Sequence, residues 1–391
     1  MQLSKEEQEM LDGERGDAVR ESMDILVALG RIYGAQNMVA VTSAQVSGVS
    51  YKTVGQAGLE YLADLAAKGA KTKIPTFLNP AGMDRDQWKE MRIPADFAEK
   101  SIMVLDAYAK MGIMKTCTCT PYFIGIRPKR GEHVAWAESS AVAFCNSVLG
   151  ARTNREGGPS ALAAAICGVT PCYGLHLDEN RAAGMIVDVS GCTLKSVADF
   201  GALGSAIGKL VKTKYPAFSG MKPATEEQLK VLGASMAATG SVPLFYAEKI
   251  TPEWRVADGA EKLAFTDADL AAERKAMDSG LKPDLVTIGC PHASLKEIKE
   301  VAEMVAKRKP TCEFWVCTSR KMKEEADALG YGRTISTAGG RVVADTCMVV
   351  CPLEGMGYTV TGTNSGKAAA YLPNLCKQKV AFGDLEDILY R

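Results

Sequence analysis

Cysteine is the residue type in this chain whose spacing points to the most distinctive chemistry. The chain has 12 cysteines, and none of them forms the Cys-x2-Cys pair typical of zinc ribbons and ferredoxins. Most free cysteines are buried as small apolar side chains. Three of them, however, follow short apolar stretches that we expect to be strands: Cys119, Cys290 and Cys347. Thiolates that converge from separate strand ends can hold an iron–sulfur cluster.

A cluster held by three cysteines has one iron without a protein ligand. Such an iron can act as a Lewis acid on a substrate, whereas clusters for electron transfer usually have four protein ligands. The chain has only three histidines, which nearly excludes a metal site built from several imidazoles. Two of the three ligands are not decided by these residues alone, because Cys117 lies near Cys119 and Cys351 lies near Cys347 in the sequence.

Polar segments elsewhere in the chain could bind a substrate beside these thiols. Residues 47–50 (Ser-Gly-Val-Ser) form a glycine loop whose N–H groups and hydroxyls suit a carboxylate or phosphate. Glu138 could contact a substrate or cap a helix, and Lys367 could bind an anion or lie in solvent. Arg152 and Arg155 could bind a phosphate, although salt bridges explain them equally well. His292 could orient a ligand near Cys290 or cap a helix.

The elements that must position these residues alternate between strands and helices. The apolar patterns predict strands over residues 37–42, 74–78, 112–118, 284–289 and 313–317, and helices over 56–68, 95–110, 294–307 and 321–329. This alternation predicts an α/β fold of parallel sheets with helices on both faces. Ligands usually bind where loops leave the carboxyl ends of such strands, which is where the three cysteines fall.

Length and composition place further limits on the protein. At about 150 residues per domain, 391 residues predict two or three domains. Lys plus Arg equals Asp plus Glu at 46 each, so the chain lacks the basic excess expected for binding nucleic acid or anionic membranes. No apolar stretch approaches the ~20 residues of a membrane span. The acidic N-terminus does not resemble a secretion signal, so we expect a soluble, cytoplasmic protein with reduced thiols.

Shifts in composition suggest three domains. We expect an α/β domain with N-terminal helices over residues 1–120, a helix-rich α/β domain over 121–255 and a further α/β domain over 256–391. Residues 251–283 are charged and are predicted to form a connection plus a surface helix. Residues 355–363 are rich in glycine but lack the strand–helix context and the Lys-Ser/Thr pair of nucleotide loops, so nucleotide binding is rejected.

Separated motifs along almost the whole chain resemble the aconitase X family. These motifs are Gly16-x-Ala18, Ser47–Lys52, Asn79–Met83, Ala135–Ser139, Asn146–Asn154, Gly289–His292 and Asn364–Lys367. The tract Asn146–Asn154 is the most specific of them. The resemblance implies an aconitase-like fold, with several α/β/α domains and mainly parallel sheets around a central cleft. Bacterial members often carry an added small domain, so this chain is similar to the large subunit of the archaeal two-subunit form.

The resemblance also implies which residues form the site. It implies that Cys119, Cys290 and Cys347 bind an iron–sulfur cluster, most simply [4Fe-4S] with one labile iron. Cys119 is favoured over its neighbour because a small residue, Pro and Tyr follow it. The residues implied to bind the substrate are Gly48, Val49, Ser50, Asn79, Pro80, Glu138, Ser139 and Lys367. The catalytic residue is unknown in this chain, because the base is expected to be a serine of a small swivelling domain in a separate subunit.

The activity implied by the resemblance is that of a hydro-lyase with a small phosphorylated hydroxy acid as substrate. The expected reaction dehydrates (R)-5-phosphomevalonate to trans-anhydromevalonate 5-phosphate in the archaeal modified mevalonate pathway of isoprenoid biosynthesis. One alternative keeps the fold and cluster but takes another hydroxy acid, such as cis-3-hydroxy-L-proline, which has no phosphate. Alternatives of another class are a non-catalytic iron–sulfur sensor or scaffold, and a metal-free binding protein with buried thiols.

Overall fold

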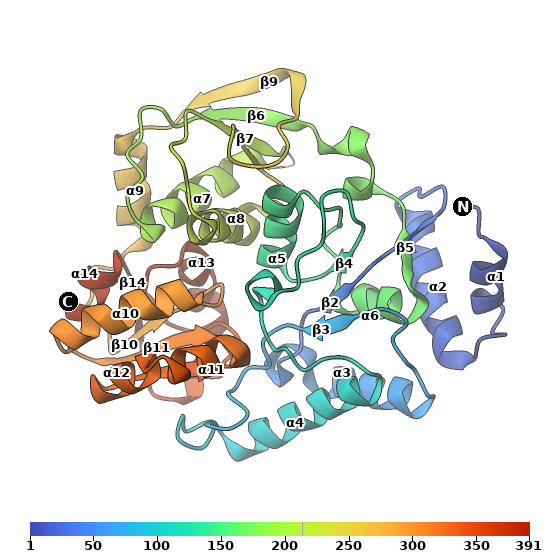
Figure 1. Ribbon diagram of the computed structural model, residues 1–391, viewed down its shortest axis with the longest axis horizontal. Helices are drawn as coiled ribbons and strands as arrows, with labels where there is room; N and C mark the ends of the chain where they lie inside the picture. The colour runs from blue at the N-terminus through green and yellow to red at the C-terminus, as the bar shows by residue number, and fades with distance from the viewer. Residues whose placement is uncertain (213) are drawn as a thin grey trace.

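Parallel sheets organise the structure, a computed structural model that describes residues 1–212 and 214–391. Within these residues the chain forms three parallel sheets and one antiparallel pair of strands. In Figure 1 residues 1–171 (blue to green) lie at the right, in the centre and at the bottom, residues 183–277 (light green to gold) at the top, and residues 285–391 (orange to red) at the lower left. We call these parts the first, second and third units.

The first unit contains the parallel sheet with strand order β3-β2-β4. Its helices are α1 (Lys5–Leu11), α2 (Asp17–Ile32), α3 (Tyr51–Ala67), α4 (Ala95–Lys110), α5 (Ser139–Phe144) and α6 (Gly158–Cys167). Its strands are β1 (Met38–Ala40), β2 (Ala44–Val46), β3 (Thr76–Leu78), β4 (Ala135–Trp136) and β5 (Val169–Pro171). Helices α3, α4 and α6 cover the sheet with an apolar cluster that includes Leu62, Val104 and Leu162.

The second unit contains the parallel sheet with strand order β8-β7-β6-β9. Its elements are β6 (Ala183–Asp188), α7 (Val197–Val211), β7 (Pro216–Ser219), α8 (Glu226–Gly240), β8 (Tyr246–Ala247), β9 (Val256–Ala264) and α9 (Asp267–Met277). Helices α7 and α8 pack closely because glycines lie at their contact. A Cβ atom on Gly240 would come within 2.0 Å of the Gly208 carbonyl oxygen, so only glycine allows this approach.

The third unit contains the parallel sheet with strand order β12-β11-β10-β13-β14. Its strands are β10 (Leu285–Ile288), β11 (Glu313–Thr318), β12 (Gly340–Ala344), β13 (Val360–Thr363) and β14 (Lys379–Phe382). Its helices are α10 (Leu295–Lys307), α11 (Arg320–Ala328), α12 (Tyr331–Thr337), α13 (Gly366–Cys376) and α14 (Leu385–Tyr390). Side chains alternate along β11, so Phe314 and Val316 pack in one apolar cluster and Trp315 and Cys317 in another. Helices therefore cover both faces of this sheet.

The predicted α/β fold with parallel sheets is confirmed. Several predicted elements differ in detail. Residues 112–118 do not form a strand, because among the described residues they pair with β3 only through the bridge between Met114 and Phe77. Strand β2 was not predicted. Helix α3 has a first turn before Gly55, whose non-helical backbone (φ +63°) interrupts it, so the predicted start at residue 56 matches the continuous part of the helix. The segment 251–283 contains the nine-residue strand β9 as well as the expected helix α9.

The limits predicted for the three domains, near residues 120 and 255, stay a prediction. The parallel sheets themselves use strands from residues 44–136, 183–264 and 285–382. In the part of the chain that the structure describes, no helix combines the length and the apolar character that crossing a membrane requires.

Candidate active site

The carboxyl edges of two parallel sheets border one cavity of about 240 Å³. In the first unit, β2, β3 and β4 end just before Ser47, Asn79 and Ala137, which all line the cavity. In the third unit, β10, β12 and β13 lead into the segments that carry Cys290, Cys347 and Lys367. Parallel strands end at a common edge, which explains why residues far apart in the sequence meet here.

Every residue that the resemblance assigned to the cluster or to the substrate lines this cavity. They are Gly48, Val49, Ser50, Asn79, Pro80, Cys119, Glu138, Ser139, Cys290, Cys347 and Lys367. The two alternative cysteines, Cys117 and Cys351, are described and buried but are not among the lining residues. The structure therefore brings the predicted residues together, while their roles as ligands and substrate contacts stay predictions.

The three thiols lie in a connected arrangement. Cys119, Cys290 and Cys347 are 4%, 4% and 7% exposed. The Cys290 and Cys347 thiols lie next to each other, and their interaction raises the pKa of Cys290 and lowers that of Cys347. The Sγ atom of Cys119 accepts the backbone N–H of His292 at 3.2 Å. Each thiol is therefore close to at least one of the other cysteine-bearing segments.

His292 connects all three segments through its ring as well as its backbone. Its Nδ1 atom lies 3.0 Å from the hydroxyl of Thr118, next to Cys119. Its Nε2 atom lies 2.9 Å from the carbonyl oxygen of Thr346, next to Cys347. A carbonyl oxygen only accepts, so Nε2 carries the proton. Burial lowers the pKa of His292 to about 4, and the ring is therefore neutral at physiological pH.

The donor set fits an iron–sulfur cluster better than a single metal ion. Within residues 1–212 and 214–391, no three His, Cys, Asp or Glu side chains are grouped closely enough to hold one ion. A cluster sets a different requirement, because each thiolate binds a different iron and the sulfurs need not meet at one point. Burial raises the pKa of Cys119 to about 12, but the ammonium group of Lys367 acts in the opposite direction on all three thiols. That cation favours the thiolate form that iron binds.

Lys367 is held in the cavity by a buried ion pair with Glu138. Glu138 also accepts an N–H of the Asn79 amide at 2.6 Å and the hydroxyl of Ser140 at 3.1 Å. Burial alone would raise the pKa of Glu138, but the charge of Lys367 and these hydrogen bonds hold it at about 2. The carboxylate in return raises the pKa of Lys367 against the effect of burial. Both groups are therefore charged at neutral pH.

Two further features of the lining are open to a ligand. The Asn79 Oδ1 atom is buried without a hydrogen-bond partner among the described residues, which is the state expected of an atom that contacts a bound molecule. Gly48 has a φ of +74°, and a Cβ there would meet no atom within 4 Å. The loop after β2 therefore has room beside its backbone, as its predicted role in binding an anion requires.

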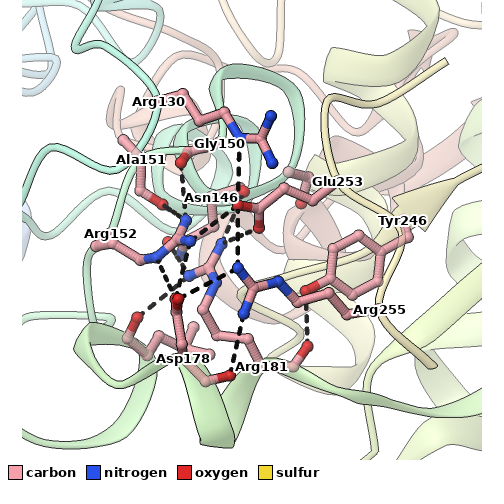
Figure 2. Close-up of polar contacts among 12 residues, drawn as sticks. Arg130, Asn146, Gly150, Ala151, Arg152, Asp178, Arg181, Tyr246, Glu253 and Arg255 are labelled. Carbon is pink, nitrogen blue, oxygen red and sulfur yellow. Dashed lines mark hydrogen bonds and ion pairs between the residues drawn. The ribbon is translucent and has the colours of Figure 1, made fainter. Parts of the chain in front are cut away.

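The structure distinguishes Arg152 from Arg155, which the sequence left as equal candidates for binding a phosphate. Figure 2 shows Arg152 within a polar network, where it donates to Asp178 at 3.0 Å and to Glu253 at 2.8 Å. None of its hydrogen-bond partners lines the cavity. Arg155 does line the cavity, is exposed, and forms no hydrogen bond or ion pair with the residues that the structure describes. Arg155 is thus the arginine available to a substrate.

Sequence reasoning missed several lining residues. Tyr371 and Leu375 line the cavity from α13, four and eight positions after Lys367. Helical periodicity places such positions on one face, so this signal could have identified them once Lys367 was chosen. Thr53, in the first turn of α3, and Val350, three residues after Cys347, also line the cavity; no motif in the sequence pointed to either.

Comparisons with known proteins cover the whole chain. Models of the first, second and third domains of aconitase X match residues 1–179, 183–275 and 283–391. The phosphomevalonate dehydratase large subunit of Methanothermobacter thermautotrophicus is 50% identical over 391 residues, which cover 99% of this chain and 98% of that protein. The cis-3-hydroxy-L-proline dehydratase of Pseudomonas aeruginosa is 33% identical, covering 97% of this chain and 68% of that protein. The crystal structure of Thermococcus kodakaraensis aconitase X in its holo-form has a TM-score of 0.93 at 47% identity, covering 100% of this chain and 99% of that chain.

Proposed function

The chain belongs to the aconitase X family, and on that premise we propose that it is the large subunit of a phosphomevalonate dehydratase. The proposed reaction removes water from (R)-5-phosphomevalonate to give trans-anhydromevalonate 5-phosphate, a step of the archaeal modified mevalonate pathway. The observation that carries the proposal is the full-length similarity to a subunit of that name. The cavity supports it, because three thiols, a buried ammonium and a free guanidinium surround one space.

The proposed reaction has two chemical difficulties. The proton to be lost lies on a methylene beside a carboxylate and is weakly acidic, and hydroxide is a poor leaving group. When bound to Cys119, Cys290 and Cys347, an iron–sulfur cluster, which we propose to be [4Fe-4S] with one iron free of protein ligands, would supply a Lewis acid that eases both. The site residues of this chain have the remaining tasks of binding and orienting the substrate.

The cavity has two cationic side chains, and the proposed substrate has two anionic groups, a carboxylate and a phosphate. We propose that Lys367, which Glu138 keeps charged and in place, offsets negative charge near the thiols. We propose that Arg155, which has no partner among the described residues, binds an anionic group near the cavity opening. Asn79 would accept a hydrogen bond from the substrate through its free Oδ1 atom, since its amide nitrogen already donates to Glu138.

The general base is proposed to come from the partner subunit. Among the described residues that line the cavity, Glu138 is the one carboxylate, and it already accepts hydrogen bonds from Asn79, Ser140 and Lys367. Those contacts hold its pKa at about 2, which makes it a weak proton acceptor. We therefore propose that a small subunit, with a serine on a swivelling domain, supplies the base. We also expect the protein to act in the cytoplasm, where its 12 free thiols stay reduced.

A turnover assay tests the proposal and its main alternative. The chain is co-produced anaerobically with its small subunit, and iron per chain and dehydration of (R)-5-phosphomevalonate and of cis-3-hydroxy-L-proline are measured. The proposal predicts iron in the complex and turnover of phosphomevalonate. The similarity to a hydroxyproline dehydratase keeps the second substrate as the rival. Turnover of hydroxyproline alone would support that rival, and bound iron without turnover of either would favour a sensor or scaffold.

A further inference from the structure

A second charged group lies where the first unit meets the third. It consists of Asp84, Arg85 and Asp86 from the segment after β3, Arg320 from the first turn of α11, and Asp345 directly after β12. We call these five residues the Arg320 network. The side chains of Asp84 and Asp345 are fully buried, and that of Arg320 is 20% exposed. None of the five is among the described residues that line the cavity.

Two guanidinium groups bind three carboxylates in this network. Arg320 donates to Asp84 at 2.9 Å and is also ion-paired with Asp86 and Asp345. Arg85 donates from Nε to Asp345 at 2.8 Å. Asp345 is thus held from two directions, by one arginine of the first unit and one of the third. A buried carboxylate without a counter-charge is strongly destabilising. Asp345 therefore has to stay in contact with these arginines, which restricts its position.

The same network joins the backbones of the two units. The second carboxylate oxygen of Asp84 accepts the N–H of Ala344, the last residue of β12, at 2.9 Å. The carbonyl oxygen of Asp345 accepts the N–H of Ala81 at 2.8 Å. Asp345 has a φ of +64°, a left-handed conformation that residues other than glycine rarely adopt. The contacts with the two arginines hold that turn, from which the chain continues to Cys347.

Both ends of the joined segments line the cavity. Asn79 begins the segment that carries Asp84 and Arg85, and its amide contacts Glu138. Cys347 lies two residues beyond Asp345. We propose that Arg320 and Asp345 are positioning residues, which fix Cys347 relative to Cys290 and to the substrate-binding side of the cavity around Asn79. The inference rests on the proposed function in one respect, namely that Cys347 is a cluster ligand.

A second buried ion-pair network serves as a control. It distinguishes a role of the Arg320 network in positioning Cys347 from a role in stabilising the fold alone. Arg152, Arg181 and Glu253 join the first unit to the second (Figure 2), and they are at least as buried as Arg320. The hydrogen-bond partners of Arg152 do not line the cavity. If the Arg320 network only stabilised the fold, Arg320→Lys and Arg152→Lys would therefore have the same consequences. Lysine keeps the charge but lacks the planar fork that reaches several carboxylates.

The test compares Arg320→Lys and Asp345→Asn with Arg152→Lys and Asp86→Asn. Each is prepared as the full chain with its small subunit, and the melting temperature, the rate of iron loss to a chelator and the EPR spectrum of the cluster are measured. We expect Arg320→Lys and Asp345→Asn to lose iron about tenfold faster or more and to change the EPR spectrum. Arg152→Lys should lower the melting temperature without either effect. Asp86→Asn should resemble wild type, because the Asp86 side chain is 72% exposed.

The rate of disulfide formation in the iron-free chain tests the positioning role without depending on the proposed cofactor. Oxidation with diamide should join Cys290 and Cys347, whose thiols are in contact, and we expect this reaction to be several-fold slower in both network variants. If one variant fails to fold, the other still decides. Wild-type rates of iron loss and of disulfide formation in the folded variants would overturn the inference. If the wild-type chain binds no iron, the proposed cofactor is overturned. If disulfide formation is then still slower in the variants than in wild type, the positioning role is supported.

Discussion

The buried ion pair of Glu138 and Lys367 joins the first unit to the third within the cavity lining. The pKa of Glu138 is about 2 in the folded chain against an ordinary value of 4.5. Because the folded pKa is the lower one, the pair stabilises the fold above pH 4.5, and that contribution is lost as the pH falls toward 2. We expect this pair alone to account for a loss on the order of 3 kcal/mol over that interval.

Replacing Glu138 tests this description. Glu138→Gln leaves the Lys367 ammonium buried without its counter-charge, so the free energy of unfolding should fall by about 3–5 kcal/mol at pH 7. The difference from wild type should shrink as the pH falls toward 2. The control is Glu354→Gln, whose ion pair with Lys52 is partly exposed and should cost no more than about 1 kcal/mol. Urea titrations at several pH values measure both, and equal effects of the two substitutions would contradict the buried pair's importance.

Arg155 is the residue whose role in substrate binding is most open to test. Because its guanidinium has no partner among the described residues, Arg155→Gln should leave the fold and the iron content unchanged. Loss of a charged hydrogen bond is worth about 1.5–3 kcal/mol, which corresponds to a rise in KM for phosphomevalonate of roughly tenfold or more, with a smaller effect on kcat.

Two comparisons sharpen the Arg155 experiment. Unphosphorylated mevalonate should show no penalty from Arg155→Gln if the arginine binds the phosphate, and the full penalty if it binds the carboxylate. Arg152→Lys should leave KM unchanged, since Arg152 is committed to Asp178 and Glu253. An unchanged KM for phosphomevalonate in Arg155→Gln would remove Arg155 from the proposed site.

At the residue scale the sequence placed the thiols in the cavity more readily than it paired the charges. The residues alone left Cys117 and Cys351 open, and in the part of the chain that the structure describes, residues 112–118 before Cys119 form no strand; the resemblance to the family favoured the three thiols that line the cavity. The difference between Arg152 and Arg155 could not be predicted, because Glu253, the partner that engages Arg152, lies 101 positions away in the chain. The pairing of Glu138 with Lys367 spans 229 positions and was equally out of reach.

Among the elements, the turn after β10 is tightly constrained by its neighbours. Gly289 precedes Cys290 with a φ of +92°, and a Cβ there would lie 2.0 Å from the carbonyl oxygen of Cys317 in β11. Gly289→Ala should therefore lower the free energy of unfolding by about 3 kcal/mol or more, from backbone strain and from overpacking together. Chemical denaturation of the full chain measures this loss.

The matched control for this turn is Gly330→Ala. Gly330 has a similar φ of +82°, but no atom lies within 4 Å of its Cβ position. Its substitution should cost only the conformational strain of about 1–2 kcal/mol. If the two alanine variants were equally stable, the close approach of β10 to β11 would not constrain the Cys290 turn.

Element prediction succeeded where the pattern of apolar residues was local. Helix α4 begins and ends where its periodicity predicts, at Ala95 and Lys110. Strand β9 was missed because it lies at the edge of its sheet and carries exposed polar residues such as Asp258 and Lys262. Residues 112–118 looked like a strand, yet only Met114 forms a bridge with β3 in the described residues. Strand formation depends on a partner that the local sequence does not show.

At the scale of the whole molecule, the site belongs to two units rather than to one. The first unit supplies Cys119 and the loops after β2, β3 and β4 that line the cavity, and the third supplies Cys290, Cys347 and Lys367. Periodicity predicted parallel sheets in both regions, but it gives no information on which sheet edges face each other. The resemblance to the aconitase X family supplied that arrangement, and the structure brings the same residues to one cavity.

The need for a second subunit is a prediction at this scale. Because the one carboxylate among the described residues of the cavity lining is a weak base at a pKa of about 2, the iron-loaded large subunit alone should bind phosphomevalonate without dehydrating it. Adding the small subunit should start turnover. Stopped assays with and without the small subunit measure this dependence, and full dehydration by the isolated large subunit would place the base in this chain instead.

The iron content of cysteine variants tests the central claim most directly. Cys119→Ser, Cys290→Ser and Cys347→Ser should each lose most of the iron and all of the dehydratase activity after anaerobic purification. Cys117 and Cys351 are buried more deeply but lie outside the cavity lining, so Cys117→Ser and Cys351→Ser should keep both the iron and the activity, as should Cys192→Ser. Wild-type iron in Cys290→Ser, or loss of iron in Cys117→Ser, would contradict the assignment of the three thiols as the ligands of the cluster.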